Sequence, residues 1–401
     1  MTVRLTAVLL LAGLLVGDVA LAADWPRFGG VKGDFIAPDT GINKDWATRA
    51  PQVLWQAELT DDGYAGPAVA DGKVYIIDHR GAQDVVRAID LATGQDVWSF
   101  AYDDPGNPNY GFARSTPCID DGVVYTLSRK NLLHALNAAD GALMWSRDVH
   151  TDFQGEKPEW DYSASPIVDG DRLVVVAGGP NASVVTLDKK TGQTIWAGGG
   201  TFETGYATPV IATINEVKQY LVFTAKALTG VSAAAGALLW QIPWPTEYGV
   251  NAALPIVDGN YVFATSGYRY GGGVSQILPG GPQQVWFSKA MQAHFSSPVY
   301  YKGYIWGTTD PGDLICLAPS DGSVLWRQRG FEKGGIVIVD DAIIALNGAT
   351  GEIIMAATST AGYQELGRLQ GLGGQSWTAP IVAGGKLIIR NKSALACLDL
   401  M

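Results

Sequence analysis

Only a few residues of this 401-residue chain have the types and spacing that catalysis or metal binding requires. The three cysteines, Cys118, Cys316 and Cys397, lie far apart and offer no paired metal ligands, and their odd number leaves at least one unpaired within a monomer. His294 could serve as a general base, but the sequence places no carboxylate beside it. A histidine of this kind more often makes a structural hydrogen bond. These residues by themselves do not define a catalytic centre.

Two turns with paired carboxylates are the remaining candidates for metal chemistry. Asp103–Gly106 and Asp310–Asp313 each combine two aspartates with Pro and Gly, and each could bind Ca²⁺. Neither forms a complete ligand loop, and such sequences usually form plain turns. The chain also lacks a Ser–His–Asp set in a recognisable context, a phosphate-binding loop and the dinucleotide-binding glycine fingerprint. The sequence therefore names no hydrolytic or nucleotide-dependent reaction.

The composition predicts one repeat domain with ample core. Hydrophobic residues make up 47% of the chain and charged residues 17%, and the 50 glycines suit a structure with many turns. The formal net charge of −11 argues against nucleic acid or an anionic membrane as the partner. Acidity identifies no other partner, because a solvated acidic surface explains it equally well.

The N-terminal segment predicts export. Residues 1–22 contain Arg4, an apolar run over Ala7–Val16 and the small-residue cleavage pattern Ala20–Ala22, which together indicate a secretory signal peptide. The apolar run is too short for a stable membrane span. We therefore expect a periplasmic or secreted protein.

One short pattern organises the rest of the chain. Ala88–Trp98 runs from a strand through a Thr-Gly turn into a second strand that ends on Trp, and it recurs at Ala135–Trp145, Thr186–Trp196 and Cys316–Trp326. The tryptophans recur about every 40–50 residues, which is typical of propeller blades and solenoids. Glycine supplies the positive φ that the turn needs, and we expect each Trp ring to be buried between neighbouring units.

A second hairpin with an Asp-Gly or similar turn precedes each of these, and it usually begins at a proline. The clearest examples are Pro67–Tyr75, Pro117–Tyr125, Pro166–Val174, Pro255–Phe263, Pro298–Trp306 and Pro380–Ile388. Each unit is therefore a four-stranded antiparallel meander, A to D, and such units stack radially as blades. A unit without a terminal Trp lies between Trp326 and Trp377, which brings the count to about eight.

We expect an all-β, eight-bladed β-propeller over residues 51–401, preceded by an N-terminal arm over 23–50. The arm has Trp25, Phe28 and Trp46 as anchors. The last unit ends after its third strand, and Pro51–Leu59 reads as a strand that could pair with Ser393–Leu400. Closing the ring with the N-terminal strand would remove two open sheet edges.

The meander places short turns on one face of the ring and the longer B–C and D–A loops on the other, where binding residues tend to lie. Because strand A is innermost, the D–A segments converge on the channel, and an aromatic mouth with a few cations suits a planar or anionic ligand. Arg114 and Lys333 would need an anionic partner, a ring face or water there. The candidate binding residues at this mouth are Tyr64, Tyr110, Arg114, Tyr162, Tyr206, Asn251, His294, Lys333 and Trp377, with His79 and Arg129 from the B–C loops.

The repeat Ala-x-Asp-x-x-Thr-Gly-x-x-x-Trp, as in Ala88–Trp98, resembles the repeat of the pyrroloquinoline-quinone-like propellers. That family includes the eight-bladed quinoprotein alcohol dehydrogenases and the outer-membrane-protein assembly lipoprotein BamB. The opening Trp25–Gly30 also resembles exported bacterial members of unassigned function. The resemblance covers the chain from about Asp24 to its end. It implies the fold and does not imply a reaction, because function lies in sites grafted onto a fold.

The resemblance leaves two classes of function open. One is an exported, non-catalytic, BamB-like propeller that binds a protein, peptide or small molecule as a monomer without a cofactor. The other is a quinoprotein alcohol or sugar dehydrogenase, with pyrroloquinoline quinone in the channel and calcium as Lewis acid. The dehydrogenases of the family typically carry adjacent cysteines, long insertions and an acidic base. This chain has no Cys-Cys pair and its units are compact, so we favour the binding protein and assign no catalytic residue.

Overall fold

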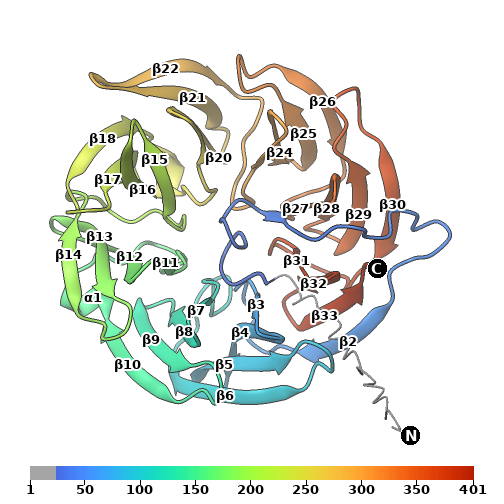
Figure 1. The fold of residues 1–401 in the computed structure, drawn as a ribbon, viewed down its shortest axis with the longest axis horizontal. Helices are drawn as coiled ribbons and strands as arrows, with labels where there is room; N and C mark the ends of the chain where they lie inside the picture. The colour runs from blue at the N-terminus through green and yellow to red at the C-terminus, as the bar shows by residue number, and fades with distance from the viewer. Residues whose placement is uncertain (1–23) are drawn as a thin grey trace, which may run out of the picture.

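The computed structural model describes residues 24–401, so the predicted signal peptide lies outside the described residues. Eight sheets, each with four antiparallel strands, form a ring around a central axis (Figure 1). Seven of the sheets have four strands, and the eighth has a fifth strand contributed by the arm. The predicted all-β, eight-bladed propeller is therefore confirmed.

Blades 1 to 4 follow one another in chain order. Their strands are β3 (Ala68–Ala70), β4 (Lys73–Arg80), β5 (Gln83–Asp90) and β6 (Asp96–Asp103); β7 (Cys118–Asp120), β8 (Val123–Leu127), β9 (Leu132–Asn137) and β10 (Leu143–Asp148); β11 (Ile167–Asp169), β12 (Arg172–Gly179), β13 (Ala182–Asp188) and β14 (Thr194–Gly198); and β15 (Val210–Ile214), β16 (Val217–Phe223), β17 (Ala227–Ser232) and β18 (Leu238–Pro243). The short helix α1 (Val149–Asp152) and the 3₁₀ turn η1 (Glu247–Gly249) lie in connections between blades.

Blades 5 to 8 complete the ring. Their strands are β19 (Ile256–Asp258), β20 (Tyr261–Ser266), β21 (Gly271–Leu278) and β22 (Gly281–Ser288); β23 (Val299–Tyr301), β24 (Tyr304–Thr309), β25 (Asp313–Leu317) and β26 (Val324–Arg329); β27 (Ile336–Val339), β28 (Ala342–Leu346), β29 (Glu352–Ala357) and β30 (Glu365–Gln370), with β1 (Ile36–Ala37) added; and β31 (Ile381–Ala383), β32 (Lys386–Arg390), β33 (Ala394–Asp399) and β2 (Val53–Glu58). Blade 7 is the unit expected between Trp326 and Trp377.

The ring closes where the two ends of the chain meet. Strand β2 pairs antiparallel with β33, with Trp55 opposite Cys397, so the predicted closure by the N-terminal strand is confirmed. A buried ion pair reinforces the same seam, because Arg390 donates to Asp61 at 2.9 Å and both side chains are about fully buried. Such a pair costs desolvation, and Arg390 offsets this by also donating to the carbonyls of Gly63 and Ala65.

At five of the eight interfaces between the described blades, a Trp ring meets a turn glycine of the next blade. Trp98 of blade 1 donates its indole N–H to the carbonyl of Ala138 in blade 2 at 3.0 Å. Gly141, in the C–D turn of blade 2, has φ of +75°, and a Cβ there would stand 2.5 Å from the Trp98 ring. The turn glycine is therefore required both by the backbone and by the approach of the ring. The same pairing recurs at Trp55 and Gly94, Trp145 and Gly192, Trp196 and Gly236, and Trp286 and Gly322.

Blade 7 lacks the repeated Trp, and the arm supplies one. In β30 the position opposite Met355, just before the register shift, is Gly367, whereas the same position in β6 is Trp98. Trp46 from the arm packs against Gly367, where a Cβ would meet the Cβ of Trp46 at 2.5 Å. The Trp46 side chain is only 4% exposed. Trp46, more than 300 positions away in sequence, thus occupies the space that the repeated Trp fills in the other blades.

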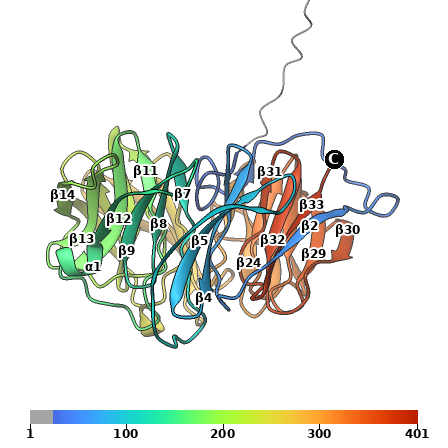
Figure 2. The same ribbon diagram turned by 90° about the horizontal axis from the view of Figure 1, so that it is seen from below.

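The arm also crosses the middle of the ring, as Figure 1 shows. Trp25 forms a bridge with Val69 of blade 1, and β1 pairs in parallel with β27 of blade 7. Lys44 forms an ion pair at 3.0 Å with Asp340 in the A–B turn of blade 7. The arm therefore closes the channel on the face that carries the short turns, and Figure 2 shows the blades from the side.

The Trp–Gly contact predicts a large stability loss on truncation. Trp98→Ala should lower the free energy of unfolding by about 3–5 kcal/mol, because it opens a cavity between two blades. The adjacent Val97 is 48% exposed, so Val97→Ala is a matched control that should change stability by less than about 0.5 kcal/mol. Denaturant titration of both variants measures the difference, and a loss below about 1 kcal/mol for Trp98→Ala would contradict the role given to the ring.

The seam predicts a loss of solubility on truncation. Removing residues up to Leu59 deletes β2 and leaves β33 as an open edge. We expect insoluble or multimeric protein by size-exclusion chromatography, with the chain beginning at Ala23 as the control. A soluble monomer that unfolds cooperatively after this deletion would show that the ring does not depend on the seam.

Candidate functional site

A cavity of about 290 Å³ opens among the loops at the inner end of the blades. Most of its lining comes from the connections that precede the A strands, and Phe28 and Phe35 of the arm contribute to it. Because the arm crosses the opposite face, the cavity is a pocket closed at one end by the protein's own N-terminal segment. Its lining residues are Phe28, Phe35, Tyr64, Gly66, Tyr110, Arg114, Trp160, Ser163, Tyr206, Thr208, Val250, Ala252, Tyr268, His294, Phe295, Ser297, Lys333, Trp377, Thr378 and Ala379.

Aromatic rings form an almost continuous wall around this cavity. Eight rings contact one another in series, with centroids 4.6–6.2 Å apart, a spacing at which such pairs are attractive. Tyr64 and Trp377 are stacked at 5.3 Å, and the other contacts are tilted or edge-to-face. In order, the rings are Tyr206, Trp160, Tyr248, Tyr268, His294, Phe295, Trp377 and Tyr64, and all of them except Tyr248 line the cavity itself.

Three tyrosines near the mouth have a left-handed backbone. Tyr110, Tyr248 and Tyr268 have φ of 65°, 59° and 52°. A bulky residue in this region costs about 1–3 kcal/mol and persists where the surroundings hold it, which is common at binding sites. Tyr110 and Tyr248 are each 56% exposed, so their rings lie in contact with solvent beside the opening.

The two predicted cations of the cavity are held in different ways. Arg114 donates to the carbonyls of Asn109, Gly111 and Trp160, so its N–H groups already have partners within the protein. It also lies 3.6 Å from the Asp161 carboxylate, which it shares with Arg129 and Lys157. Lys333 instead faces two rings, with its ammonium 5.8 Å from the Trp377 centroid and 6.0 Å from that of Phe295. No ion pair of Lys333 occurs within residues 24–401. The ammonium therefore remains free to bind an anion.

His294 lies in the same wall next to Phe295. Burial, together with the nearby Lys333 charge, lowers the pKa of His294 to about 4, so the ring is neutral at pH 7. Its Nδ1 atom is buried and makes no hydrogen bond to any described residue. Buried polar atoms of this kind usually have a partner, and an unpaired one points to water or a ligand.

The structure brings seven of the eleven residues predicted from the sequence to this cavity. They are Tyr64, Tyr110, Arg114, Tyr206, His294, Lys333 and Trp377.

Two further candidates, Tyr162 and Asn251, are buried beneath the loops and do not line the cavity. Tyr162 is 5% exposed, and its hydroxyl lies 3.0 Å from His150. Asn251 is fully buried, and its amide donates to the carbonyls of Thr224, Ala225 and Trp244. Both side chains fix the shape of the connections that carry cavity residues.

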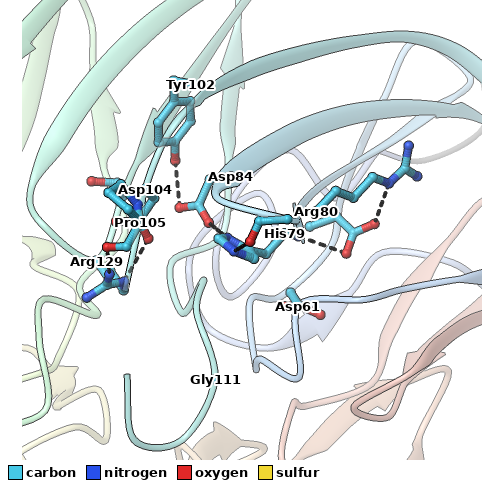
Figure 3. Close-up of polar contacts among 12 residues, drawn as sticks. Asp61, His79, Arg80, Asp84, Tyr102, Asp104, Pro105, Gly111 and Arg129 are labelled. Carbon is cyan, nitrogen blue, oxygen red and sulfur yellow. Dashed lines mark hydrogen bonds and ion pairs between the residues drawn. The ribbon is translucent and has the colours of Figure 1, made fainter. Parts of the chain in front are cut away.

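The remaining two candidates, His79 and Arg129, belong to a buried polar cluster under the loops of blades 1 and 2 (Figure 3). His79 Nδ1 lies 2.9 Å from Asp84, and the second oxygen of Asp84 accepts a hydrogen bond from Tyr102 at 3.1 Å. Arg129 donates to Asp104 at 2.7 Å. Burial raises the pKa of the Asp84 carboxyl to about 6.

This cluster has the residue types of a metal site, but its candidate ligand atoms already have partners within the protein. Oxygen and nitrogen atoms of His79, Asp84 and Asp104 lie within 4.8 Å of one another. Asp104 is already paired with Arg129 at 2.7 Å and with Lys130 at 2.6 Å, and His79 Nε2 lies 3.0 Å from the carbonyl of Gly81. The cluster therefore satisfies its own charges, and we assign it a structural role.

Several cavity residues were not among the candidates from the sequence. Trp160 and Phe295 are neighbours of predicted residues in the same connections, so an aromatic count over those segments could have found them. Phe28 and Phe35 had no signal of this kind, because only the path of the arm places them under the cavity.

Comparison with known proteins shows that the chain is similar to two groups, the BamB assembly factors and the quinoprotein dehydrogenases. The protein family described as outer membrane protein assembly factor BamB matches residues 82–328. The BamB of Yersinia pestis is 25% identical over 351 residues, covering 79% of this chain and 80% of that protein. A quinohemoprotein alcohol dehydrogenase of Comamonas testosteroni is 26% identical over 199 residues, covering 41% of this chain and 27% of the enzyme.

Solved structures show the same fold in both groups. BamB from Moraxella catarrhalis superposes with a TM-score of 0.63 at 16% identity, covering 87% of this chain and 99% of that one. A europium-containing methanol dehydrogenase superposes with a TM-score of 0.65 at 12% identity, covering 94% of this chain and 98% of the enzyme. At these identities the likeness concerns the fold alone.

The buried carboxyl of Asp84 predicts a defined pH dependence. Its pKa in the folded protein is about 6 against an ordinary value of 3.8, so the folded state keeps a proton that the unfolded state has lost between these pH values. The free energy of unfolding of the parent protein, measured relative to that of the Asp84→Asn variant, should therefore fall as the pH rises from 4 to 6. The total decrease should be about 3 kcal/mol at most. Urea titration at pH 4, 5 and 6 measures this difference.

The matched control is Asp90→Asn in an exposed turn. Hydrogen bonds from Thr93 hold the pKa of Asp90 below its ordinary value, so this variant should show little change over the same range. If the difference between the Asp84 variant and the parent protein is constant from pH 4 to 6, the raised pKa is wrong.

Proposed function

The chain belongs to the family described as outer membrane protein assembly factor BamB, and we propose that it is an exported, non-catalytic binding or scaffold propeller that works through its loop-rich face. The proposal includes a signal peptide over residues 1–22, an arm over 23–50 and a propeller over 51–401. Relatives named as assembly factors match most of the chain, whereas the quinohemoprotein dehydrogenase matches less than half of it.

The observation that carries this proposal is the aromatic pocket on the loop face, closed at its base by the arm. Its wall is mainly apolar and aromatic, and its polar groups are few, as expected of a binding site. His294 has a neighbouring ring on either side of it in this wall, Tyr268 and Phe295, and no lining residue is an aspartate or glutamate that could exchange protons with it. The pocket therefore suits binding and lacks an acid–base pair for catalysis.

The residues of the cavity do not fit a quinone cofactor held with calcium. Calcium takes six to eight oxygen ligands and prefers carboxylates, yet none of the cavity-lining residues among those described is acidic. A cofactor with several carboxylates would also need several cations with free N–H groups, and those of Arg114 already donate to three carbonyls. For these reasons we propose no step through pyrroloquinoline quinone or calcium.

A protein partner in the cell envelope is the interaction that we propose. It is supported by relatives named as outer membrane protein assembly factors and by the signal-peptide pattern of residues 1–22, and we propose a periplasmic or secreted location on the same grounds. Within residues 24–401, no helix has the length and apolar character needed to cross a membrane. We propose that the propeller is a monomer before it meets its partner.

Site-specific crosslinking in the producing cell tests which face binds. A photoreactive residue at Tyr248, which is 56% exposed beside the cavity, should crosslink to an envelope protein. The control carries the photoreactive residue in place of Lys190, which lies in an exposed turn of the opposite face, and this variant should not crosslink to an envelope protein. Crosslinks from position 190 alone would show that the partner binds the short-turn face, which would contradict the proposal.

A parallel assay tests the absence of catalysis. The purified protein mixed with pyrroloquinoline quinone and Ca²⁺ should show no bound-cofactor absorbance and no dye reduction with alcohols or sugars. Turnover in this assay would overturn the non-catalytic assignment.

A further inference from the structure

We propose that the cavity binds a planar aromatic group that carries a single carboxylate, with the carboxylate at Lys333 and the ring against Trp377 and Phe295. This deepens the proposed function, since it assumes that the loop face is the binding surface and names the chemistry that the pocket accepts. Three features of the described residues carry it: a cation without an ion-pair partner, a neutral histidine in the cavity lining and a wall of rings.

The unmatched cation decides the sign and number of charges on the ligand. Lys333 lines the cavity, has ring faces as neighbours and makes no ion pair among residues 24–401. Arg114, the other cation of the lining, donates its N–H groups to three carbonyls and shares Asp161 with Arg129 and Lys157. Lys333 is therefore the lining cation with N–H groups free to pair directly with one carboxylate, which favours a monocarboxylate as the ligand.

The acidic groups around Lys333 do not replace a ligand. Asp310 is close enough for Lys333 to lower its pKa, but burial acts more strongly and raises it. The two groups do not form an ion pair, and Asp310 is not part of the cavity lining. A ligand carboxylate within the cavity would be the first anion in direct contact with the ammonium.

His294 provides the second contact. Its ring is neutral at pH 7 and can present one N–H. His294 and Lys333 both line the cavity and both neighbour Phe295. A carboxylate has two oxygens, so one can accept from Lys333 and the other from His294.

The wall of rings determines the rest of the ligand. Rings that stack or meet edge-to-face favour a flat, apolar partner, and each such contact adds about 0.5–1.5 kcal/mol beyond burial. The volume of about 290 Å³ lies near the lower end of ligand pockets, so it suits a group of one or two rings. A phenyl or indolyl group joined to a carboxylate by a short chain satisfies both limits.

Two sources could present this chemistry to the pocket. One is a free aromatic acid, and the other is an aromatic residue at the C-terminus of a polypeptide, which ends in a carboxylate. The exposed rings of Tyr110 and Tyr248 beside the opening leave room for a chain to continue outward along the loop face. The shared chemistry is the same, and the experiment separates the sources.

Titration calorimetry and tryptophan fluorescence of the whole exported chain test the proposal with four probes. These are 3-phenylpropionate, its neutral amide, N-acetyl-Ala-Phe with a free carboxylate, and the same peptide as its C-terminal amide. At least one acid should bind, and its amide should bind about tenfold or more weakly, which corresponds to about 1.4 kcal/mol or more for the lost charged hydrogen bonds. Binding of the peptide acid well above that of 3-phenylpropionate would identify a polypeptide terminus as the source, and the reverse a free acid.

Two lysine variants assign the effect to the cavity. Lys333→Met keeps the stem and should remove the preference for the acid over its amide. Lys226→Met deletes a lysine from the same face but outside this cavity, where it pairs with Glu203, and should leave the preference unchanged. If Lys333→Met does not fold, as judged by its unfolding transition, the comparison of acid and amide in the parent protein still tests the charge.

Either of two results would overturn the inference: no binding of any acid at millimolar concentration, or equal affinity for acid and amide in the parent protein. The proposed function would survive both if Tyr248 still crosslinked to an envelope protein. Loss of that crosslink together with tight binding of the free acid would instead retain the ligand chemistry and reject the scaffold role.

Discussion

The structure depends on a contact between a tryptophan ring and a glycine of the next blade. A single four-stranded meander leaves both faces open, and it becomes stable only when a neighbour covers it. At five of the eight interfaces between the described blades, a Trp ring lies on the backbone of the next C–D turn, so close that no side chain fits at the turn glycine. Because this spacing repeats, it sets the angle between blades, and the angle sets how many blades close a ring.

The same constraint explains the double use of the N-terminal segment. A ring has no free end, so the last blade must find its fourth strand elsewhere, and β2 provides it. Blade 7 ends in Gly367 where the others carry Trp, and Trp46 completes that contact from the segment just before β2. The arm then continues across the channel, where Phe28 and Phe35 reach the cavity. One segment therefore closes the sheet, fills an interface and shapes the binding site.

The cavity follows from the radial arrangement of the blades. All D–A connections enter the ring at its axis, so aromatic residues scattered over the sequence at intervals of one blade become neighbours there. The charged side chains near the axis differ from one another in the partners that they contact. The cations of blades 1 and 2 are held by carboxylates in a buried network around Asp104 and Arg129, whereas Lys333 is left with rings alone. The contrast between a cation that already has hydrogen-bonding partners and one that has none is what separates a structural cluster from a binding site.

The sequence by itself determined the blade, its count and its closure. These rest on local chemistry, since turn glycines, alternating strands and a repeated Trp act within one unit, and an unpaired third strand demands a fourth. It also indicated which loops converge, because every strand reverses direction and the faces alternate. It did not determine which charges remain free. Arg114 and Lys333 occupy similar positions before an inner strand, yet only the folded chain brings Asp161 and three carbonyls to Arg114 and leaves Lys333 between Trp377 and Phe295. Nor could it show that Trp46 fits against Gly367, because a contact between residues so distant in sequence exists only after the ring has closed.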